Sequence, residues 1–168
     1  MNVSEALQSR RSVRRFTADA VLGEDINTLM HVAMSGPSAC NARPWDFWCV
    51  TSEEKLALLR KASRFSNMKA PLAVVVCGNL KKALPMGMAD YWIQDCSAAI
   101  ENILLQAVEL GLGAVWCGLH PQKGAVTRTR EALDLPDSIV PLGLLWIGHP
   151  AESPAPRDQY DEKRVHYV

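Results

Sequence analysis

The chain has 168 residues, and its 18 Lys and Arg residues balance its 18 Asp and Glu residues, so its net charge is zero. A domain of this length buries roughly 70% of the surface that its unfolded chain exposes, and an apolar content of 48% is enough for such a core. A neutral chain lacks the basic excess of most nucleic-acid-binding proteins, and no stretch approaches the ~20 apolar residues of a membrane span. We therefore expect one domain over residues 1–168, without a nucleic-acid or membrane partner.

The N-terminal sequence and the cysteines indicate the compartment. The segment MNVSEALQSRR contains no apolar signal-peptide run, which predicts a soluble, cytoplasmic protein. The five cysteines are widely spaced and form no CxxC pair, and the histidines show no metal-ligand spacing. We therefore expect free thiols in a reducing compartment, and neither a disulfide framework nor a metal site. The cysteines are Cys40, Cys49, Cys77, Cys96 and Cys117.

In the first half of the chain, apolar spacing predicts three helices and two strands. The helices are expected at residues 4–9, 24–35 and 53–62, and the strands at 47–51 and 71–77. Gly36-Pro37 should end the second helix. Ser52 is expected to cap the third, because a Ser hydroxyl can accept a hydrogen bond from a free helix N–H. A polar loop bounded by prolines occupies residues 37–44.

The strongest helical pattern lies at residues 91–110, where apolar residues recur in steps of three and four. A second apolar line of Ala98, Leu105 and Val108 lies on another face, so either the core or a partner chain should cover both sides. Gly111 should cap this helix. Beyond it we expect a strand at 113–117, a helix at 127–133, a strand at 139–147 interrupted by Pro141 and Gly143, and a polar tail from His149. This mixture indicates an α+β sandwich rather than a doubly wound parallel sheet.

Three short segments could bind a ligand. Arg10-Arg11-Ser12 could hold a phosphate monoester through charged and neutral hydrogen bonds, or could be a solvated charge run or a nucleic-acid patch. In the loop at 37–45, Ser38 and Asn41 could bind the edge of a heteroaromatic ring. That loop could equally be a plain surface loop anchored by Trp45.

The third segment is the glycine-rich stretch at 111–118, which would let the backbone approach a flat ligand, or could be a helix cap followed by a core strand. It lacks GxGxxG, so a Rossmann dinucleotide site is not indicated. No catalytic triad, HExxH or Walker motif occurs.

The order and spacing of these segments are similar to those of the nitroreductase family along nearly the whole chain. The segments are S-R-R-S-V-R-R-F at 9–16, G-P-S-A-C-N-A-R-P-W at 36–45, A-P-L-A-V-V-V-C at 70–77, D-Y-W-I-Q-D-C-S-A-A-I-E-N-I-L-L-Q-A at 90–107, G-L-G-A-V-W-C-G at 111–118 and E-K-R-V-H-Y at 162–167. One departure is Arg43, because the family often has Gln before the Pro-Trp pair. The departure does not change the expectation of flavin binding, but it concerns a residue expected at the entrance for the substrate.

The resemblance implies an α+β fold with a central mixed or antiparallel sheet flanked by helices, in an intertwined homodimer with two FMN molecules at the interface. Arg10, Arg11, Ser12 and Arg164 would hold the phosphate and ribityl chain. Arg14 would lie near the pyrimidine side of the ring, where a cation stabilises reduced flavin. Further ligands would be Pro37, then Ser38, Ala39 and Asn41 from the other subunit, and the backbone of Val115, Trp116, Cys117 and Gly118 facing the ring.

The implied activity is a ping-pong transfer of electrons from NADH or NADPH, through flavin N5, to nitroaromatics, quinones or similar small planar acceptors. The non-covalently bound flavin would carry the chemistry, so no protein side chain is expected to act as a catalyst. Two alternatives remain open. One is a specialised reductase of the family that acts on activated alkenes, peptidyl azolines or halogenated aromatics. The other is a flavin-binding or phosphate-sensing module without turnover.

Overall fold

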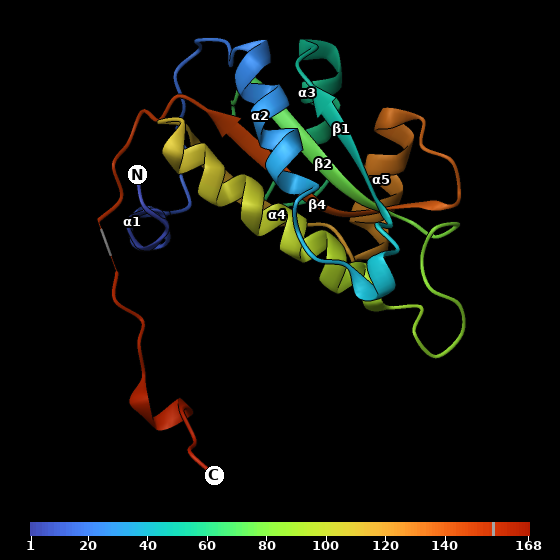
Figure 1. Ribbon diagram of the computed structural model, residues 1–168. Helices are drawn as coiled ribbons and strands as arrows, with labels where there is room; N and C mark the ends of the chain where they lie inside the picture. The colour runs from blue at the N-terminus through green and yellow to red at the C-terminus, as the bar shows by residue number, and fades with distance from the viewer. Residues whose placement is uncertain (156) are drawn as a thin grey trace.

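The computed structural model describes residues 1–155 and 157–168. Its centre is a four-stranded antiparallel sheet in the order β1-β2-β4-β3, flanked by helices (Figure 1). The α+β architecture with an antiparallel sheet is therefore confirmed. The strands are β1 (Trp45–Val50), β2 (Leu72–Asn79), β3 (Gly113–Gly118) and β4 (Ile139–Gly148). The helices are α1 (Val3–Ser9), α2 (Gly23–Ala33), α3 (Glu53–Leu59), α4 (Tyr91–Glu109) and α5 (Lys123–Leu133), with short 3₁₀ turns η1 (Ala39–Asn41) and η2 (Glu162–Arg164).

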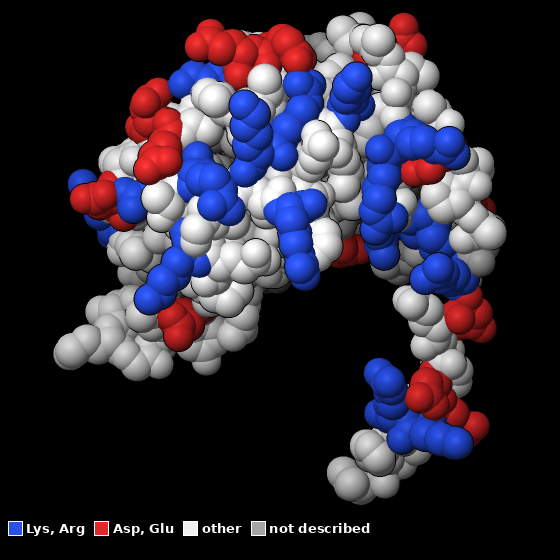
Figure 2. Space-filling view, turned by 180° about the vertical axis from the view of Figure 1, so that it is seen from behind, with Lys and Arg blue, Asp and Glu red and all other residues white. Residues whose placement is uncertain are grey.

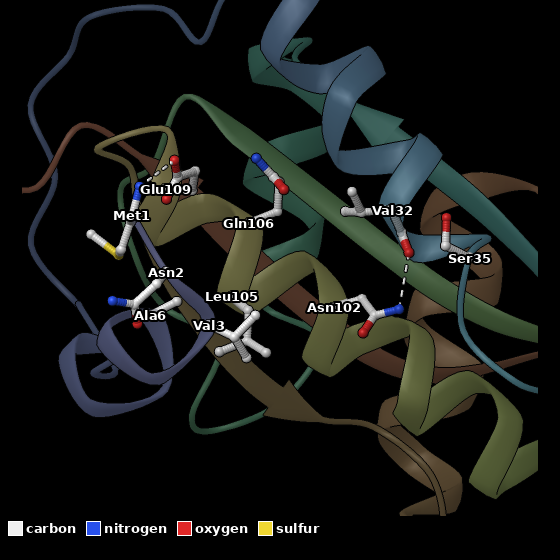
Figure 3. Close-up of a pocket in the computed structure, with 10 residues that line it drawn as sticks. All are labelled: Met1, Asn2, Val3, Ala6, Val32, Ser35, Asn102, Leu105, Gln106 and Glu109. Carbon is white, nitrogen blue, oxygen red and sulfur yellow. Dashed lines mark hydrogen bonds and ion pairs between the residues drawn. The ribbon is translucent and has the colours of Figure 1, made fainter.

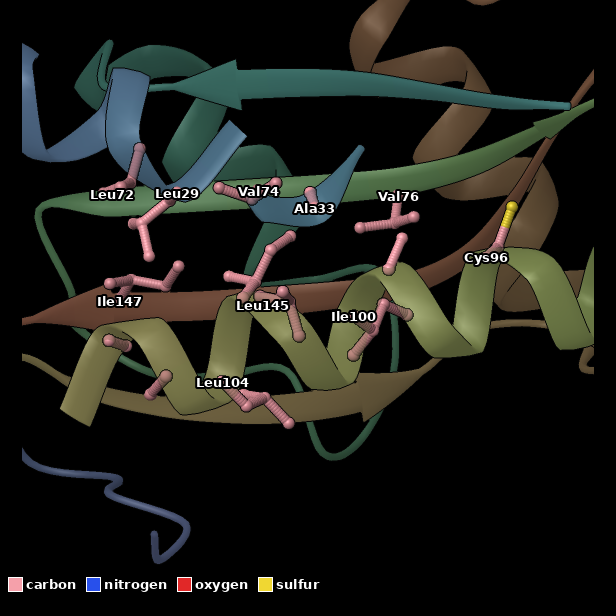
Figure 4. Close-up of a cluster of buried hydrophobic side chains, with 14 of the residues drawn as sticks. Leu29, Ala33, Leu72, Val74, Val76, Cys96, Ile100, Leu104, Leu145 and Ile147 are labelled. Carbon is pink, nitrogen blue, oxygen red and sulfur yellow. The ribbon is translucent and has the colours of Figure 1, made fainter. Parts of the chain in front are cut away.

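Each face of the sheet carries its own apolar cluster, because successive side chains of a strand point to opposite faces. Val74 and Val76 of β2 pack with α2 and α4 (Figure 4). Val75 and Cys77 of the same strand pack with residues of α3 and α5. Full burial of a Val, Leu or Ile side chain contributes roughly 1.5–3 kcal/mol, so the two clusters fix both helical layers on the sheet.

Helix α4 lies along the first face and buries one continuous stripe of side chains. Leu105 and Val108, on its second apolar line, are only half-buried within this chain. Within one chain, neighbouring residues therefore cover this second apolar side of α4 only in part. As expected, Gly111 follows the helix in a left-handed conformation with φ 70°.

Two local expectations were wrong, the hydrogen bond of Ser52 and the start of α5. Ser52 is the N-cap residue of α3, as expected, but its side chain makes no capping hydrogen bond. The acidic residues Glu53 and Glu54 in the first turn favour the positive end of α3 instead. Helix α5 begins at Lys123 rather than at residue 127, so Gly124 lies inside a helix that tertiary packing of Ala125 stabilises. Strand β4 has nearly the expected bounds, and its pairing with β2 is irregular between Pro141 and Gly143, where the interruption was expected. It runs through Pro141, which lies beyond the part paired with β3, and absorbs a register shift opposite Val76 and Cys77.

Across residues 1–155 and 157–168, no helix combines the length and apolar character that a bilayer crossing requires. In the same ranges, no three His, Cys, Asp or Glu side chains form a group that could hold a metal ion. The five cysteines are free, and Cys40 and Cys49 are exposed.

Candidate functional site

The arginine-rich segment at residues 10–15 lies along the outer edge of β3. Ser12 forms a parallel bridge with Ala114, and the Val13 N–H donates to the Ala114 carbonyl at 3.0 Å. The contact is close, because a Cβ added to Gly113 would come within 2.7 Å of the Val13 side chain. The structure thus brings together two segments that are a hundred residues apart in the sequence.

The same contact orients the backbone of β3. Because the Ala114 carbonyl points outward to Val13, the alternation of an antiparallel strand also directs the peptide groups of Trp116 and Gly118 outward. Their N–H groups therefore face the edge where residues 10–15 lie. The side chains of Val115 and Cys117 are buried on the opposite face of the sheet, toward α3 and α5. At these two positions only the backbone is available to a ligand at the edge.

Trp116 presents a large aromatic surface beside these N–H groups. Its side chain is 38% exposed and lies over Gly143 of β4. A Cβ at residue 143 would be 2.2 Å from the indole Nε1, so only glycine leaves room for the ring. An exposed indole on a strand edge can stack against a planar ligand.

A cavity of about 570 Å³ opens at the arginine segment. Its lining contains four arginines and no carboxylate, which favours a phosphate or another anion. Figure 2 shows that Lys and Arg side chains also spread across this view of the body. The lining residues are Arg10, Arg11, Ser12, Arg14, Pro154, Ala155, Arg157 and Gln159.

Contacts to the beginning of the C-terminal tail shape this cavity. The Arg11 guanidinium donates from Nε to the Ala155 carbonyl and from Nη2 to the Arg157 carbonyl, both at 3.1 Å. Glu152 accepts from the Arg14 backbone N–H at 2.6 Å and from the Arg15 side chain at 3.0 Å. These bonds lower the pKa of Glu152 below its ordinary value of 4.5, with the Arg14 N–H as the main cause. The tail therefore forms one wall of the arginine cavity.

Arg14 also acts on the buried thiol of Cys117. Burial raises the pKa of Cys117 to about 11, and the Arg14 charge opposes part of that rise. The thiol donates to the Phe65 carbonyl at 3.3 Å, which places residues 63–66 beside β3. A thiol with this pKa is not a nucleophile at neutral pH.

The loop at residues 37–44 has an unusual backbone. Cys40, Asn41 and Arg43 have φ values of 49°, 54° and 47°, in the left-handed region that non-glycine residues rarely adopt. The Ser38 hydroxyl accepts from the Arg43 N–H at 3.0 Å, and the buried Asp95 of α4 accepts from the Ala39 N–H at 2.9 Å. The loop is therefore tied both to itself and to α4.

Within one chain, this loop and the arginine cavity lie on different sides of α4. Arg10 pairs with Glu101 at 3.5 Å, whereas Ala39 bonds to Asp95. Six helical residues correspond to roughly 9 Å along the axis and about 120° around it. None of Pro37, Ser38, Ala39 and Asn41 lines the arginine cavity.

Arg164, the other expected phosphate ligand, lies in η2 near the end of a tail that leaves the body (Figure 1). Its side chain is 86% exposed and pairs with Asp161 three residues earlier at 3.2 Å. The structure does not bring Arg164 to Arg10, and its role toward phosphate stays a prediction.

The sequence analysis missed Arg157, Gln159 and Asp95. Arg157 and Gln159 lie in a polar tail that has no apolar period, so no pattern linked them to Arg11. Asp95 did carry a signal, because it interrupts the buried stripe of α4 between Trp92 and Ala99. A carboxylate at such a position is rarely buried without a hydrogen-bonding partner.

Comparisons with known proteins show what the chain as a whole is similar to. The model of a family described as the nitroreductase family matches residues 7–67 and 66–149. A protein of Methanothermobacter thermautotrophicus, with the provisional name NADH dehydrogenase/NAD(P)H nitroreductase, is 39% identical over 99% of this chain and 86% of its own length. A Bacteroides thetaiotaomicron crystal structure with the same provisional name has a TM-score of 0.91 and 36% identity, covering 98% of this chain and 95% of that one. An FMN-dependent nitroreductase from Clostridium difficile has a TM-score of 0.89 and 30% identity over 98% of both chains.

Proposed function

Because the chain belongs to the nitroreductase family, we propose that it is an oxidoreductase that binds FMN non-covalently and takes electrons from NADH or NADPH. The observation that carries this proposal is the cavity with four arginines and no carboxylate, beside the outward N–H groups of β3. FMN offers the matching groups, a phosphate at one end and a flat ring at the other. The names of relatives include FMN and NAD(P)H, which supports the same cofactors here.

The residues of the cavity, and those of β3 to which Ser12 bridges, fit FMN in three respects. Arg10 and the Ser12 hydroxyl offer a charged and a neutral donor to a phosphate. The exposed Trp116 indole offers a stacking surface, and the N–H groups of Trp116 and Gly118 offer donors to the ring edge. Bound there, FMN supplies the chemistry of accepting a hydride from a nicotinamide and passing electrons to a second substrate.

The chain's own contribution is binding, orientation and charge. Arg14 is the cation that would stabilise negative charge on the reduced ring. Arg11 contributes mainly by holding the tail as a wall, because its Nε and Nη2 donate to tail carbonyls. No protein nucleophile is required, and a single ring face would admit one planar substrate at a time. Donor and acceptor must then alternate, which is a ping-pong scheme.

We propose that the acceptor is a nitroaromatic, a quinone or a similar planar molecule. On rapid anaerobic mixing, NADH or NADPH should bleach the visible flavin band of the FMN-loaded protein within seconds. Steady-state rates with a quinone or a nitroaromatic should then give parallel double-reciprocal lines. If neither nicotinamide bleaches the flavin, the protein is a binding module or uses another donor. If wild-type protein binds no FMN after incubation with an excess, the proposal fails altogether.

We further propose that the functional unit is a homodimer. Leu105 and Val108 leave an apolar side of α4 half-covered, and a cavity of about 430 Å³ opens there between α1, α4 and the end of α2 (Figure 3). A second chain would cover this side and could bring its own Ser38 and Asn41 to the arginine cavity. Sedimentation at micromolar concentration should show a dimer. A holo-protein that stays monomeric with flavin bound would rule this out.

A further inference from the structure

Asp95 is the only Asp or Glu among the buried residues of the described chain. It is 5% exposed and lies on the stripe of α4 that packs against the sheet. Burying a carboxylate is costly unless it accepts hydrogen bonds. Asp95 accepts one from the backbone N–H of Ala39, at 2.9 Å. This carboxylate is therefore an anchor point for the loop at residues 37–44.

Ala39 is the first residue of the turn η1, where the backbone changes direction. Ser38 precedes it with extended backbone angles and makes no side-chain capping bond to the turn. Its hydroxyl is engaged with the Arg43 N–H instead. A capping side chain within the loop usually accepts a hydrogen bond from a free N–H of the turn. Here the carboxylate of Asp95, on α4, accepts that bond.

The residues that follow need such an anchor. Cys40, Asn41 and Arg43 all have positive φ, and for non-glycine residues that conformation is strained and persists only where the surroundings enforce it. Asn102, seven residues after Asp95 on the same side of α4, donates to the Val32 carbonyl at the end of α2, at 3.0 Å. Asn102 therefore fixes the helix that leads into the loop, and Asp95 fixes the loop itself.

We propose that Asp95 is a positioning residue for flavin binding, which holds the loop in the one conformation that presents Ser38 and Asn41 to the flavin edge. This inference rests on the proposed function. Asp95 acts through its hydrogen bond to the Ala39 N–H, and it does not contact the flavin. The carboxylate oxygen is the required feature, so an amide oxygen at the same place should serve nearly as well.

The test compares four single variants of the full-length protein and the double variant Asp95→Ala/Ala39→Pro. Asp95→Ala removes the acceptor, and Asp95→Asn removes the charge but keeps an acceptor oxygen. Ala39→Pro removes the donor, and a proline is tolerated at the first position of a helical turn. Asp90→Ala is the matched control, because Asp90 is an exposed carboxylate at the start of α4 that makes no capping bond.

Two measurements are made on each variant. The first is hydrogen exchange of the Ala39 amide in flavin-free protein by NMR, in every variant that retains that amide. The second is the dissociation constant for FMN, together with the shape of the bound flavin's visible band. The first reports the hydrogen bond and the second its consequence.

Asp95→Ala should speed exchange at Ala39 and weaken FMN binding at least about tenfold, the effect expected when a hydrogen bond is lost and its partly buried donor is left without a partner. Asp95→Asn should restore binding to within about threefold of wild type, and Asp90→Ala should change neither readout. Ala39→Pro should weaken binding as much as Asp95→Ala, and the double variant no further, because both remove the same bond. Ala39→Pro also keeps the question answerable if Asp95→Ala does not fold.

Two results would overturn the inference. In one, Asp95→Ala lowers thermal stability but binds FMN as tightly as Asp90→Ala does, so that Asp95 is only a structural carboxylate. In the other, Asp95→Asn is as defective as Asp95→Ala, so that charge and not the hydrogen bond matters. A wild-type protein that binds no FMN would defeat the proposed function and this role together, while the Ala39 exchange would still show whether the anchor exists.

Discussion

Two segments carry the arginines expected to bind phosphate, and they are held very differently. Residues 10–15 are tied to β3 through Val13 and to the beginning of the tail through Glu152. The segment around Arg164 makes its hydrogen bonds within itself, to Asp161 and Glu162. The first is built into the body, and the second extends away from it (Figure 1).

This difference bears on the energetics of ligand binding. A side chain that the fold already orders loses little entropy when a ligand arrives, whereas ordering a free side chain costs about 0.5–1.5 kcal/mol. Arg10 is therefore expected to contribute more to FMN affinity than Arg164. Arg164 would contribute fully only where another surface, such as a second chain, orders the tail.

The largest effect should come from Arg10→Ala. Loss of a hydrogen bond to a charged group should weaken FMN binding by about 1.5–3 kcal/mol. Riboflavin, which lacks the phosphate, should bind the variant as it binds wild type. Titration with both ligands by fluorescence quenching separates a loss of phosphate binding from a loss of binding to the rest of the flavin. Equal losses for FMN and riboflavin would show that Arg10 does not act on the phosphate.

Next in size is Gly113→Ala, which should push the arginine segment off β3. The added Cβ would meet Val13 at 2.7 Å, and overpacking of this kind typically costs about 1–3 kcal/mol of unfolding free energy. FMN affinity should fall as well, because Ser12 and Arg14 move with Val13. Gly23→Ala is the control, since a Cβ there meets nothing within 4 Å. The free energy of unfolding of both variants is measured in denaturant. Equal values for Gly113→Ala and Gly23→Ala would contradict the close packing of Val13.

A smaller effect is expected for Arg164→Ala, about 1 kcal/mol of FMN affinity after the cost of ordering the tail. If a second chain orders the tail, the loss should appear at protein concentrations where the dimer forms and vanish on dilution. Binding isotherms at two protein concentrations test this. A loss that does not depend on concentration would place Arg164 at its own chain's cavity.

The smallest effect should be the pH dependence of the tail contact. Because the pKa of Glu152 is lowered in the folded chain, its bonds to Arg14 and Arg15 stabilise the contact above the ordinary pKa of 4.5 and weaken as pH falls through the lowered value. The Arg14 and Arg15 amide signals should therefore shift on acidification in wild type and much less in Glu152→Gln. An identical shift in both proteins would assign the change to another group.

The sequence was sufficient wherever a pattern is local. The period of α4, the Val-rich strand β2 and the glycine after α4 predicted those elements to within two residues. It failed for the side-chain hydrogen bond of Ser52, where the acidic first turn favours the helix end instead, and at the start of α5, where the packing of Ala125 overrode the local preference of Gly124. The single FMN-binding domain over residues 1–168 and the cytoplasmic location stay predictions.

By itself, the sequence determined which residue types are present for the site: the arginines at 10–15, the polar loop at 37–44 and the glycine-rich strand at 113–118. Only the tertiary structure decided which of them meet. It placed residues 10–15 on β3, added Arg157 from the tail to the cavity, and set Asp95 beneath Ala39. The physical reason is that hydrogen bonds between residues 56 or more positions apart leave no periodic trace in the sequence, whereas helices and strands do.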